Sequence, residues 1–356
     1  MKKTLIALAV LAASGASFAQ SSVTLYGILD IGYSQIRPTD VGTTFGINNG
    51  GISFHTPSRF GMKGSEDMGG GLKANFDMQT GNIDFENGNV TSIGAAKSTS
   101  TFTGTSAAGA AAAGTVATTT TVANQFFNRE AWVGLSGNFG ATRLGRTSSV
   151  ATQGQASFDL NGISTSSAMS NIGIGPVTWY GSSRRSSQLQ YTTPMMAGFD
   201  AGVAATLSGD NTVGGVNKSY FQGRVNYANG PIAAGVTAET KHADANRTAW
   251  AVAGSYDFGV AKVSAGYVVS ELDNVASGAI QGGKGLHIGV KAPLGAAYVG
   301  AQYAKNTTSK DSAIEGFAGY NLSKRTSVYL DAVRVNFDNG ALANTTKYGV
   351  GILHAF

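Results

Sequence analysis

The sequence predicts an all-β fold, a 16-stranded antiparallel transmembrane β-barrel. Segments of roughly ten residues with alternating apolar and polar side chains recur along the chain, as in barrels that cross a membrane. No apolar stretch after residue 19 approaches the ~20 residues that a membrane-crossing helix needs. Residues 347–356 alternate strictly to the final residue. A last strand that pairs with the first would leave no unpaired sheet edge, which is the condition for a sheet in hydrocarbon.

The alternation places apolar and small or polar residues on opposite faces of each segment. In the segment 247–258, for example, Trp250, Val252, Tyr256 and Phe258 share one face. The predicted strands lie near residues 23–33, 53–67, 71–81, 126–136, 139–147, 184–193, 197–207, 219–228, 231–240, 247–258, 260–270, 284–292, 295–305, 312–322, 324–335 and 346–356. Their joints are alternately short and long, which is typical of tight periplasmic turns and larger external loops.

The chain is predicted to contain one targeting segment and one domain. Residues 1–19 combine Lys2 and Lys3, an apolar run and a small-residue site ending at Ala19, which indicates a cleaved signal peptide and export. Residues 20–356 then form the barrel. Residues 82–125, rich in Ala, Thr, Ser and Gly, are predicted to form a long external loop, with a plain spacer as the simpler interpretation.

The second long connection, residues 147–183, has a different composition. Asp159 is its only charged residue before the arginines at 184 and 185, and it carries several apolar residues, including Phe158, Leu160 and Ile172. An external loop with so much apolar content must pack against something, and the inside of a wide barrel is the available place.

The composition excludes several classes of function. The absence of cysteine excludes a disulfide scaffold, a thiolate metal site and a cysteine nucleophile. Removal of residues 1–19 lowers the formal net charge of +5 by two, a balance too mild to indicate a nucleic-acid partner. The four histidines show no metal-ligand spacing and no nucleophile motif is present, so we expect no metal, no cofactor and no enzyme activity.

Several motifs, taken together, resemble a known family. They are VTLYG at residues 23–27, SRFGMKGSEDMGGGL at 58–72, FNREAWVGL at 127–135, NLSKRTSVY at 321–329 and HAF at 354–356. These motifs resemble the general diffusion porins of Gram-negative bacteria, in particular the β-proteobacterial anion-preferring type. The resemblance implies a passive diffusion channel for small hydrophilic solutes in the outer membrane. It also implies a homotrimer surrounded by lipid and lipopolysaccharide, with an inward-folded third loop that narrows the lumen.

The resemblance assigns candidate residues to the pore constriction. The basic wall of the family corresponds to Arg59, Arg129 and one of Arg184 or Arg185. Alternation favours Arg184, since Leu189 and Tyr191 are expected to face lipid. The inward loop corresponds to residues 147–183, with Asp159 as its only carboxylate. Further candidates for lining the pore are Arg185, Lys63, Lys73, Arg143 and Arg224.

The candidate residues predict a preference for small anions. The potential at the narrowest point decides selectivity, because low-dielectric walls focus the field there. Arginine stays protonated and binds carboxylate or phosphate through two N–H groups. Three arginines against Asp159 would leave a local excess of two positive charges. Two plainer interpretations remain: arginines that are solvated and paired with carboxylates, and an Asp159 that caps a turn.

Two other functions remain open at this stage. An outer-membrane β-barrel enzyme would need a catalytic cluster at the rim or on the outer wall. An exported adhesion or binding protein, built for example as a β-sandwich, would bury its apolar faces and stay in solution without detergent.

Overall fold

A computed structural model describes residues 22–38, 44–48, 55–81, 83–85, 89–90, 126–175, 183–207, 212–213, 216–217, 219–240, 248–270, 275–276, 279–280, 282–338 and 343–356. The predicted signal peptide at 1–19, most of the predicted external loop at 82–125, and residues 176–182 of the second long connection lie outside these ranges. Within the described ranges, no helix is both long and apolar enough to cross a membrane.

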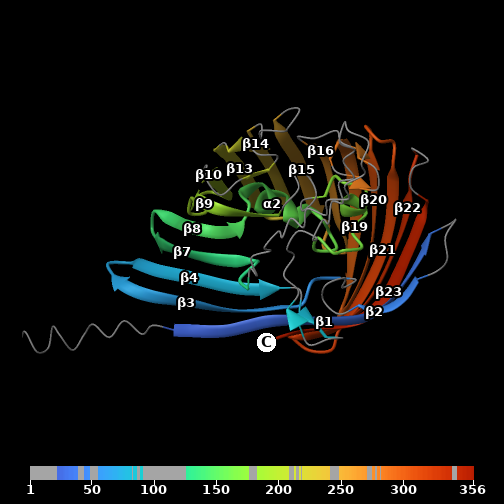
Figure 1. Cartoon of the computed structure of the whole chain (residues 1–356), viewed down its shortest axis with the longest axis horizontal. Coiled ribbons are helices and arrows are strands. Elements are labelled where there is room, and N and C mark those ends of the chain that lie inside the picture. The colour runs from blue at the N-terminus through green and yellow to red at the C-terminus, as the bar shows by residue number, and fades with distance from the viewer. Residues whose placement is uncertain are drawn as a thin grey trace, which may run out of the picture.

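The described residues form a ring of antiparallel strands, as the alternation predicts (Figure 1). In ring order the strands are β1 (Ser22–Pro38), β3 (Arg59–Gly69), β4 (Leu72–Gly81), β7 (Glu130–Gly137), β8 (Gly140–Ser148), β9 (Arg184–Thr192), β10 (Phe199–Thr206), β13 (Tyr220–Asn229), β14 (Ile232–Glu239), β15 (Ala249–Asp257), β16 (Lys262–Val269), β19 (Lys284–Leu294), β20 (Ala297–Asn306), β21 (Ser312–Asn321), β22 (Thr326–Asn336) and β23 (Thr345–Ala355). Three further strand pairs lie outside the ring: β5 (Ile83–Asp84) with β6 (Asn89–Val90), β11 (Thr212–Val213) with β12 (Val216–Asn217), and β17 (Val275–Ala276) with β18 (Ala279–Ile280).

The first and last strands of the ring close it. One edge of β1 pairs with β23, from Ile28 opposite Ala355 to Pro38 opposite Thr345. The other edge of β1 pairs first with β3 and then with β2 (Thr44–Asn48), the seventeenth strand of this sheet. Setting β2 aside, sixteen strands make a closed antiparallel barrel, which confirms the predicted fold class.

The two faces of the wall differ as the alternation predicts. On β14, Val236 is 52% exposed on the outer face, whereas its neighbour Thr237 is 1% exposed on the inner face. One predicted boundary is wrong: β3 begins at Arg59 and not near residue 53. Pro57 lacks the N–H that a paired strand needs, and the hydroxyl of Ser58 instead accepts the Asp30 N–H at 2.8 Å.

Residues 149–175 pack against the polar face of the wall, and Figure 1 places α2 within the ring of strands. This segment contains α2 (Val150–Gln155), the 3-10 helix η1 (Ala156–Phe158) and α3 (Ala168–Asn171). The Ser149 hydroxyl begins α2 by accepting the Thr152 N–H at 3.1 Å, a normal N-cap. α2 contacts β10 and β13–β15, and α3 contacts β20–β22.

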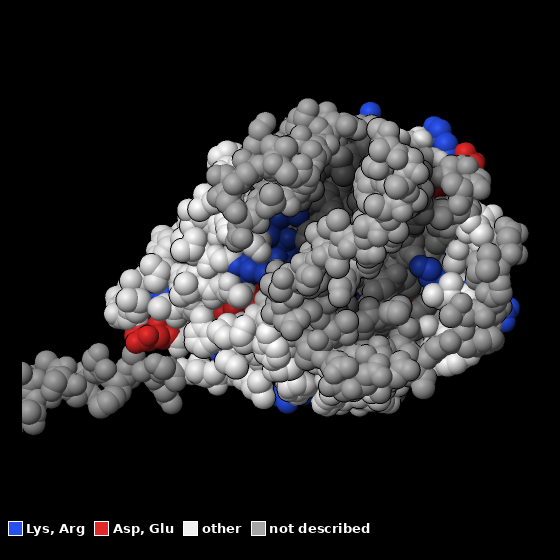
Figure 2. Space-filling view, in the orientation of Figure 1, with Lys and Arg blue, Asp and Glu red and all other residues white. Residues whose placement is uncertain are grey.

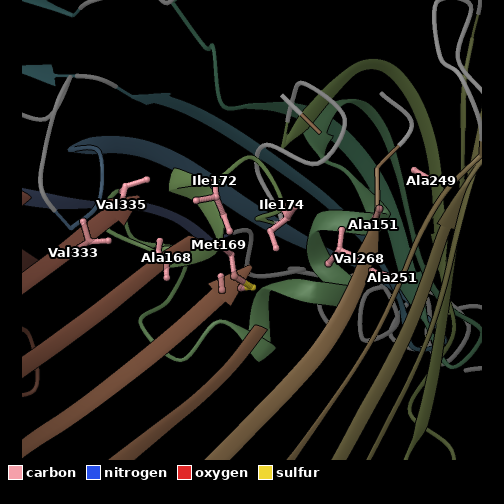
Figure 3. Close-up of a cluster of buried hydrophobic side chains, with 12 residues drawn as sticks. Ala151, Ala168, Met169, Ile172, Ile174, Ala249, Ala251, Val268, Val333 and Val335 are labelled. Carbon is pink, nitrogen blue, oxygen red and sulfur yellow. The ribbon is translucent and has the colours of Figure 1, made fainter. Parts of the chain in front are cut away.

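The apolar side chains of this segment are buried against small and β-branched wall residues (Figure 3). Met169, Ile172 and Ile174 are each at most 2% exposed. The wall contributes Ala249 and Ala251 from β15, Val268 from β16, Ala304 from β20, Ala313 from β21, and Val333 and Val335 from β22. Because these wall side chains are small, the segment can lie close to the wall.

Two glycines of the inner face are required by this close approach. A Cβ on Gly285 would lie 2.5 Å from Cδ1 of Ile174 and 2.6 Å from the Lys305 carbonyl oxygen. A Cβ on Gly235 would lie 2.8 Å from Cε2 of Phe158. These wall positions therefore exclude any side chain while the segment is in place.

We expect Gly285→Val to displace Ile174 and to lower the free energy of unfolding by about 1–3 kcal/mol, the usual cost of overpacking. Urea-induced unfolding in detergent measures the loss, and single-channel conductance reports the displaced segment. Gly223→Val is the control, because no heavy atom lies within 4 Å of a Cβ built on Gly223. Equal stability and conductance of the two variants would contradict the packing described here.

Candidate functional site

Three arginines at the starts of alternate strands of the ring form a basic cluster. Arg59 begins β3, Arg129 directly precedes β7 and Arg184 begins β9. They are close enough for Arg129 to be repelled by both Arg59 and Arg184, and for Arg59 to be repelled by Arg184. Figure 2 shows Lys and Arg side chains gathered where β8 and β9 border the opening of the barrel. Arg59 and Arg129, which the resemblance selected, therefore lie together with Arg184, which alternation favoured over Arg185.

The partners of Arg59 and Arg129 are mainly neutral. Nη1 of Arg59 donates to Oγ1 of Thr56 at 2.9 Å and to the Pro57 carbonyl at 3.0 Å. Nε of Arg129 donates to Oε1 of Gln79 at 2.7 Å. Among the described residues, neither guanidinium lies within 4.0 Å of a carboxylate oxygen. Their charges are therefore not neutralised by direct ion pairs with these residues.

Arg184 and Arg185 both reach carboxylates of the inner face. Nε of Arg184 lies 3.5 Å from Oε1 of Glu130, and Nη2 of Arg185 lies 3.4 Å from Oε1 of Glu239. Strict alternation would place only one of the two arginines inside. A β-bulge removes that restriction. Gly145 of β8 pairs with Gln188 of β9, and Thr147 pairs with Arg185, so β9 has one extra residue between these pairs and its alternation is interrupted there. Ser187 lies within the bulge with φ 49°.

The sequence prediction missed Arg146, which adjoins the basic cluster. Its Nε donates to the Asn128 carbonyl at 2.7 Å, and its Nη1 donates to the Ser186 hydroxyl at 2.9 Å. Arg146 and Arg184 repel each other. Alternation groups Arg146 with lipid-facing Leu144, so only the glycine at 145, a residue type that often marks a bulge, could have indicated its position.

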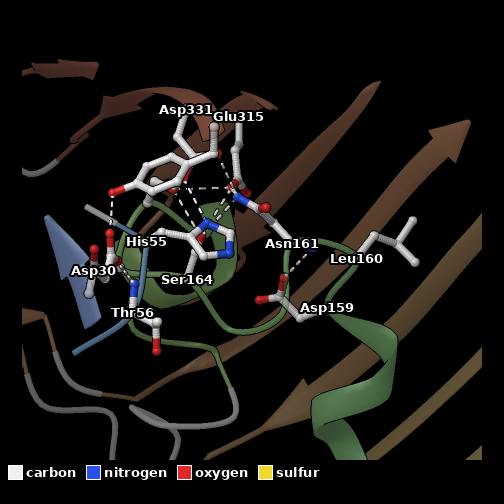
Figure 4. Close-up of polar contacts among 12 residues, drawn as sticks. Asp30, His55, Thr56, Asp159, Leu160, Asn161, Ser164, Glu315 and Asp331 are labelled. Atoms are coloured by element: carbon white, nitrogen blue, oxygen red, sulfur yellow. Dashed lines mark hydrogen bonds and ion pairs between the residues drawn. The ribbon is translucent and has the colours of Figure 1, made fainter. Parts of the chain in front are cut away.

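A second group of residues, the docking cluster, joins the segment 149–175 to the wall (Figure 4). It contains Asp159 and Asn161 from the segment, Glu315 from β21, Asp331 from β22, and His55. Glu315 accepts from Nδ2 of Asn161 at 2.6 Å and from the Ala168 N–H at 2.9 Å. Asp331 accepts from the same Asn161 amide at 3.1 Å, and its other oxygen lies 3.1 Å from Nδ1 of His55.

Asp159 is 3% exposed and is part of this network. It accepts from the Asn161 N–H at 3.1 Å, from Oγ of Ser167 at 2.5 Å and from Nε2 of Gln302 at 3.0 Å. Burial raises the pKa of its carboxyl, while the hydrogen bonds act in the opposite direction. The turn-capping interpretation therefore describes its contacts.

The sequence predicted three arginines and one acid, Asp159, at the constriction, whereas the structure places further acids beside the basic cluster and the segment. Glu130 lies beside Arg184, and Glu315 and Asp331 lie beside the segment. The sequence prediction missed Glu315 and Asp331 because their strands are distant in sequence from the segment. It also missed Glu130, although this residue directly follows Arg129.

The remaining candidates line the inner wall in different surroundings. Nζ of Lys63 lies 5.0 Å from the centre of the Tyr26 ring, and the Arg143 guanidinium lies 4.7 Å from that of Trp132. Arg224 forms an ion pair with Asp200, and Lys73 is exposed. In the described part of the chain, no group of three His, Asp or Glu side chains is arranged to hold a metal ion.

Comparison with known proteins assigns the fold and site to a family. The Gram-negative porin family matches residues 4–340. "Outer membrane porin protein 32" of Delftia acidovorans is 33% identical over the whole length of both chains. The structure of "Anion-selective porin from Comamonas acidovorans" has a TM-score of 0.69 and 27% identity, and the match covers 95% of this chain and 100% of that one. A trimer form of OmpT of Vibrio cholerae, at 14% identity and TM-score 0.57, shares the fold over 94% of this chain and 99% of that one.

The chain belongs to the Gram-negative porin family. It is an outer-membrane channel protein and not an enzyme, and its barrel is integral to that membrane. The family assignment removes both alternatives that the sequence left open, the barrel enzyme and the exported adhesion or binding protein.

We expect Glu315→Ala to loosen the segment 149–175, because it leaves the Ala168 N–H without its acceptor and removes one acceptor of the Asn161 amide. The loss should be about 1–3 kcal/mol of unfolding free energy, with larger fluctuations of the open-channel current. Urea unfolding and single-channel recording measure the two effects. Glu66→Ala removes an exposed carboxylate of β3 and is the control. A loss no greater than that of the control would show that Glu315 does not anchor the segment.

Proposed function

We propose that this porin passes small anions in preference to cations, and that its filter lies between the basic cluster and the segment 149–175. The observation that carries the proposal is that Arg59 and Arg129 repel each other and have no direct carboxylate partner among the described residues. The proposal is supported by the name of the Comamonas acidovorans structure, an anion-selective porin.

The chemistry of the two sides of the proposed filter differs. The carboxylates of the docking cluster are occupied by N–H and O–H donors of the segment and the wall, so they are poor partners for a passing cation. The guanidinium groups keep N–H donors that can replace part of the hydration shell of an anion. Arginine is weakly hydrated compared with lysine, so an anion can both bind and leave.

The position of Arg59 depends on the segment 149–175. Thr56 accepts from Arg59 and donates its own N–H to Oδ2 of Asp30 at 2.7 Å. The neighbouring His55 carbonyl accepts the Thr165 N–H at 3.1 Å. Residues 55–59 thus link the basic cluster to the docked segment, and a shift of the segment would move the filter.

The assembly we propose is a homotrimer in lipid and lipopolysaccharide, with small anionic solutes as its cargo. A distant relative of the same fold is described in a trimer form. The outer faces of the strands carry exposed apolar residues, such as Leu25, Val203 and Val236, which suit contact with acyl chains or with another copy. Residues 1–19 are proposed to direct export and to be removed, and residues 82–125 to form an external loop.

The test of the filter is the double variant Arg59→Gln/Arg129→Gln in planar bilayers. We expect the anion-to-cation permeability ratio to fall by roughly fivefold, because the loss of about 1 kcal/mol of Coulomb attraction corresponds to that factor. Reversal potentials in a salt gradient give the ratio.

The matched control removes two positive charges elsewhere. Lys324 and Arg325 are exposed in the turn between β21 and β22, so Lys324→Gln/Arg325→Gln should leave the ratio nearly unchanged. A ratio that responds equally to both double variants would place selectivity in the overall charge of the protein and would refute the local filter.

A further inference from the structure

A cavity of about 350 Å³ lies on the inner face of the wall, apart from the basic cluster. It is formed by β1, β3, β4, β7 and β8 near the tight turns that join β3 to β4 and β7 to β8. Lys63, Trp132 and Arg143 line it. Their chain neighbours Met62, Val133 and Leu144 are exposed on the outer face, so the three lining side chains face inward. Arg59, which begins β3, and Arg129, which directly precedes β7, do not line it.

Two positive charges border this cavity without direct ion pairs. Lys63 and Arg143 each lie over an aromatic ring, those of Tyr26 and Trp132. In the part of the chain that the structure describes, neither side chain lies within 4.0 Å of a carboxylate oxygen. Both therefore retain N–H donors for an anion, and the ring contacts fix their heads at the cavity.

The rest of the lining favours an organic anion over an inorganic one. Trp132 contributes aromatic surface, and Ser22, Thr24 and Ser136 contribute hydroxyl groups. A volume of this size lies at the lower end of the range of small-molecule sites, which are mostly apolar with a few polar groups that fix orientation. A flat ring can stack on the indole or on the guanidinium plane.

Asp77 limits the charge of the occupant. It lines the cavity and accepts the Tyr26 hydroxyl at 2.5 Å. With Lys63 and Arg143 it leaves a formal excess of one positive charge, which matches a monoanion. A second carboxylate on the ligand would meet the Asp77 carboxylate and be repelled.

We propose that this cavity is a binding subsite for small aromatic monocarboxylates, with Arg143 and Lys63 binding the carboxylate and Trp132 contacting the ring. The inference rests on the proposed anion-conducting function and names one class of solute for it. The solute preference of this subsite, near the tight turns, is separate from the charge selectivity of the basic cluster.

The experiment measures block of the KCl current through the intact protein in planar bilayers by sodium benzoate. We expect benzoate to interrupt the current with saturable dependence on concentration, whereas acetate, with the same charge and no ring, and benzamide, with the ring and no charge, do not. Trp132→Leu and Arg143→Gln should each raise the half-blocking concentration about five- to tenfold, in keeping with the usual energy of an aromatic or cation contact.

Two controls separate a local site from a general effect. Lys262→Gln removes a positive charge on the inner face, also near a tight turn but outside this cavity, and is compared with Lys63→Gln. Trp250→Leu removes a tryptophan from the outer face and is compared with Trp132→Leu. Block that is equally sensitive to the paired variants, or that acetate produces as well as benzoate, overturns the subsite.

A second measurement does not depend on the cavity variants. In a Trp179→Phe/Trp250→Phe protein, Trp132 is the remaining tryptophan, and saturable quenching of its fluorescence by benzoate in detergent is expected. Absence of both quenching and block, in a protein that conducts KCl with anion preference, refutes the subsite alone. Absence of anion preference with benzoate binding intact refutes the proposed filter alone.

Discussion

The requirement that every backbone N–H and C=O of the wall be paired governs this structure. In hydrocarbon an unpaired group has no water to bond with, so a sheet must close on itself. β1 meets this requirement by pairing with β23 on one edge and with β3 and then β2 on the other. Closure turns one face of every strand inward, and the two clusters and the cavity follow from what the chain places on that face.

The inner face of the wall is shaped to contact the segment 149–175 as well as water. Gly235 and Gly285 give room to Phe158 and Ile174, and Glu315 and Asp331 accept donors from the segment. A buried polar network of this kind stabilises one arrangement only when its members are satisfied, which makes it sensitive to single substitutions. Residues 55–59 extend the network to Arg59, so the position of Arg59 and the packing of the segment depend on the same contacts.

Much of the fold could be predicted from the sequence, because a strand in a membrane wall alternates and this alternation recurs along the chain. The site could be predicted only in part. Arg59 and Arg129 came from motif resemblance, and alternation favoured Arg184 over Arg185. A bulge breaks the two-residue period between β8 and β9, so both arginines reach carboxylates of the inner face, which alternation could not predict. Glu315 and Asp331 carry no local signal, since their role arises from contacts with residues about 150 positions away in the chain.

The pairing of β1 with β23 also constrains the order of assembly. These two strands are separated by nearly the whole sequence, so their contact carries the largest loop-closure entropy in the molecule. Synthesis alone cannot complete the seam, and until β23 arrives β1 offers a free edge that can recruit foreign strands. The seam therefore forms only after β23 has been made, and the closing of the barrel and the loss of its last free edge are one event.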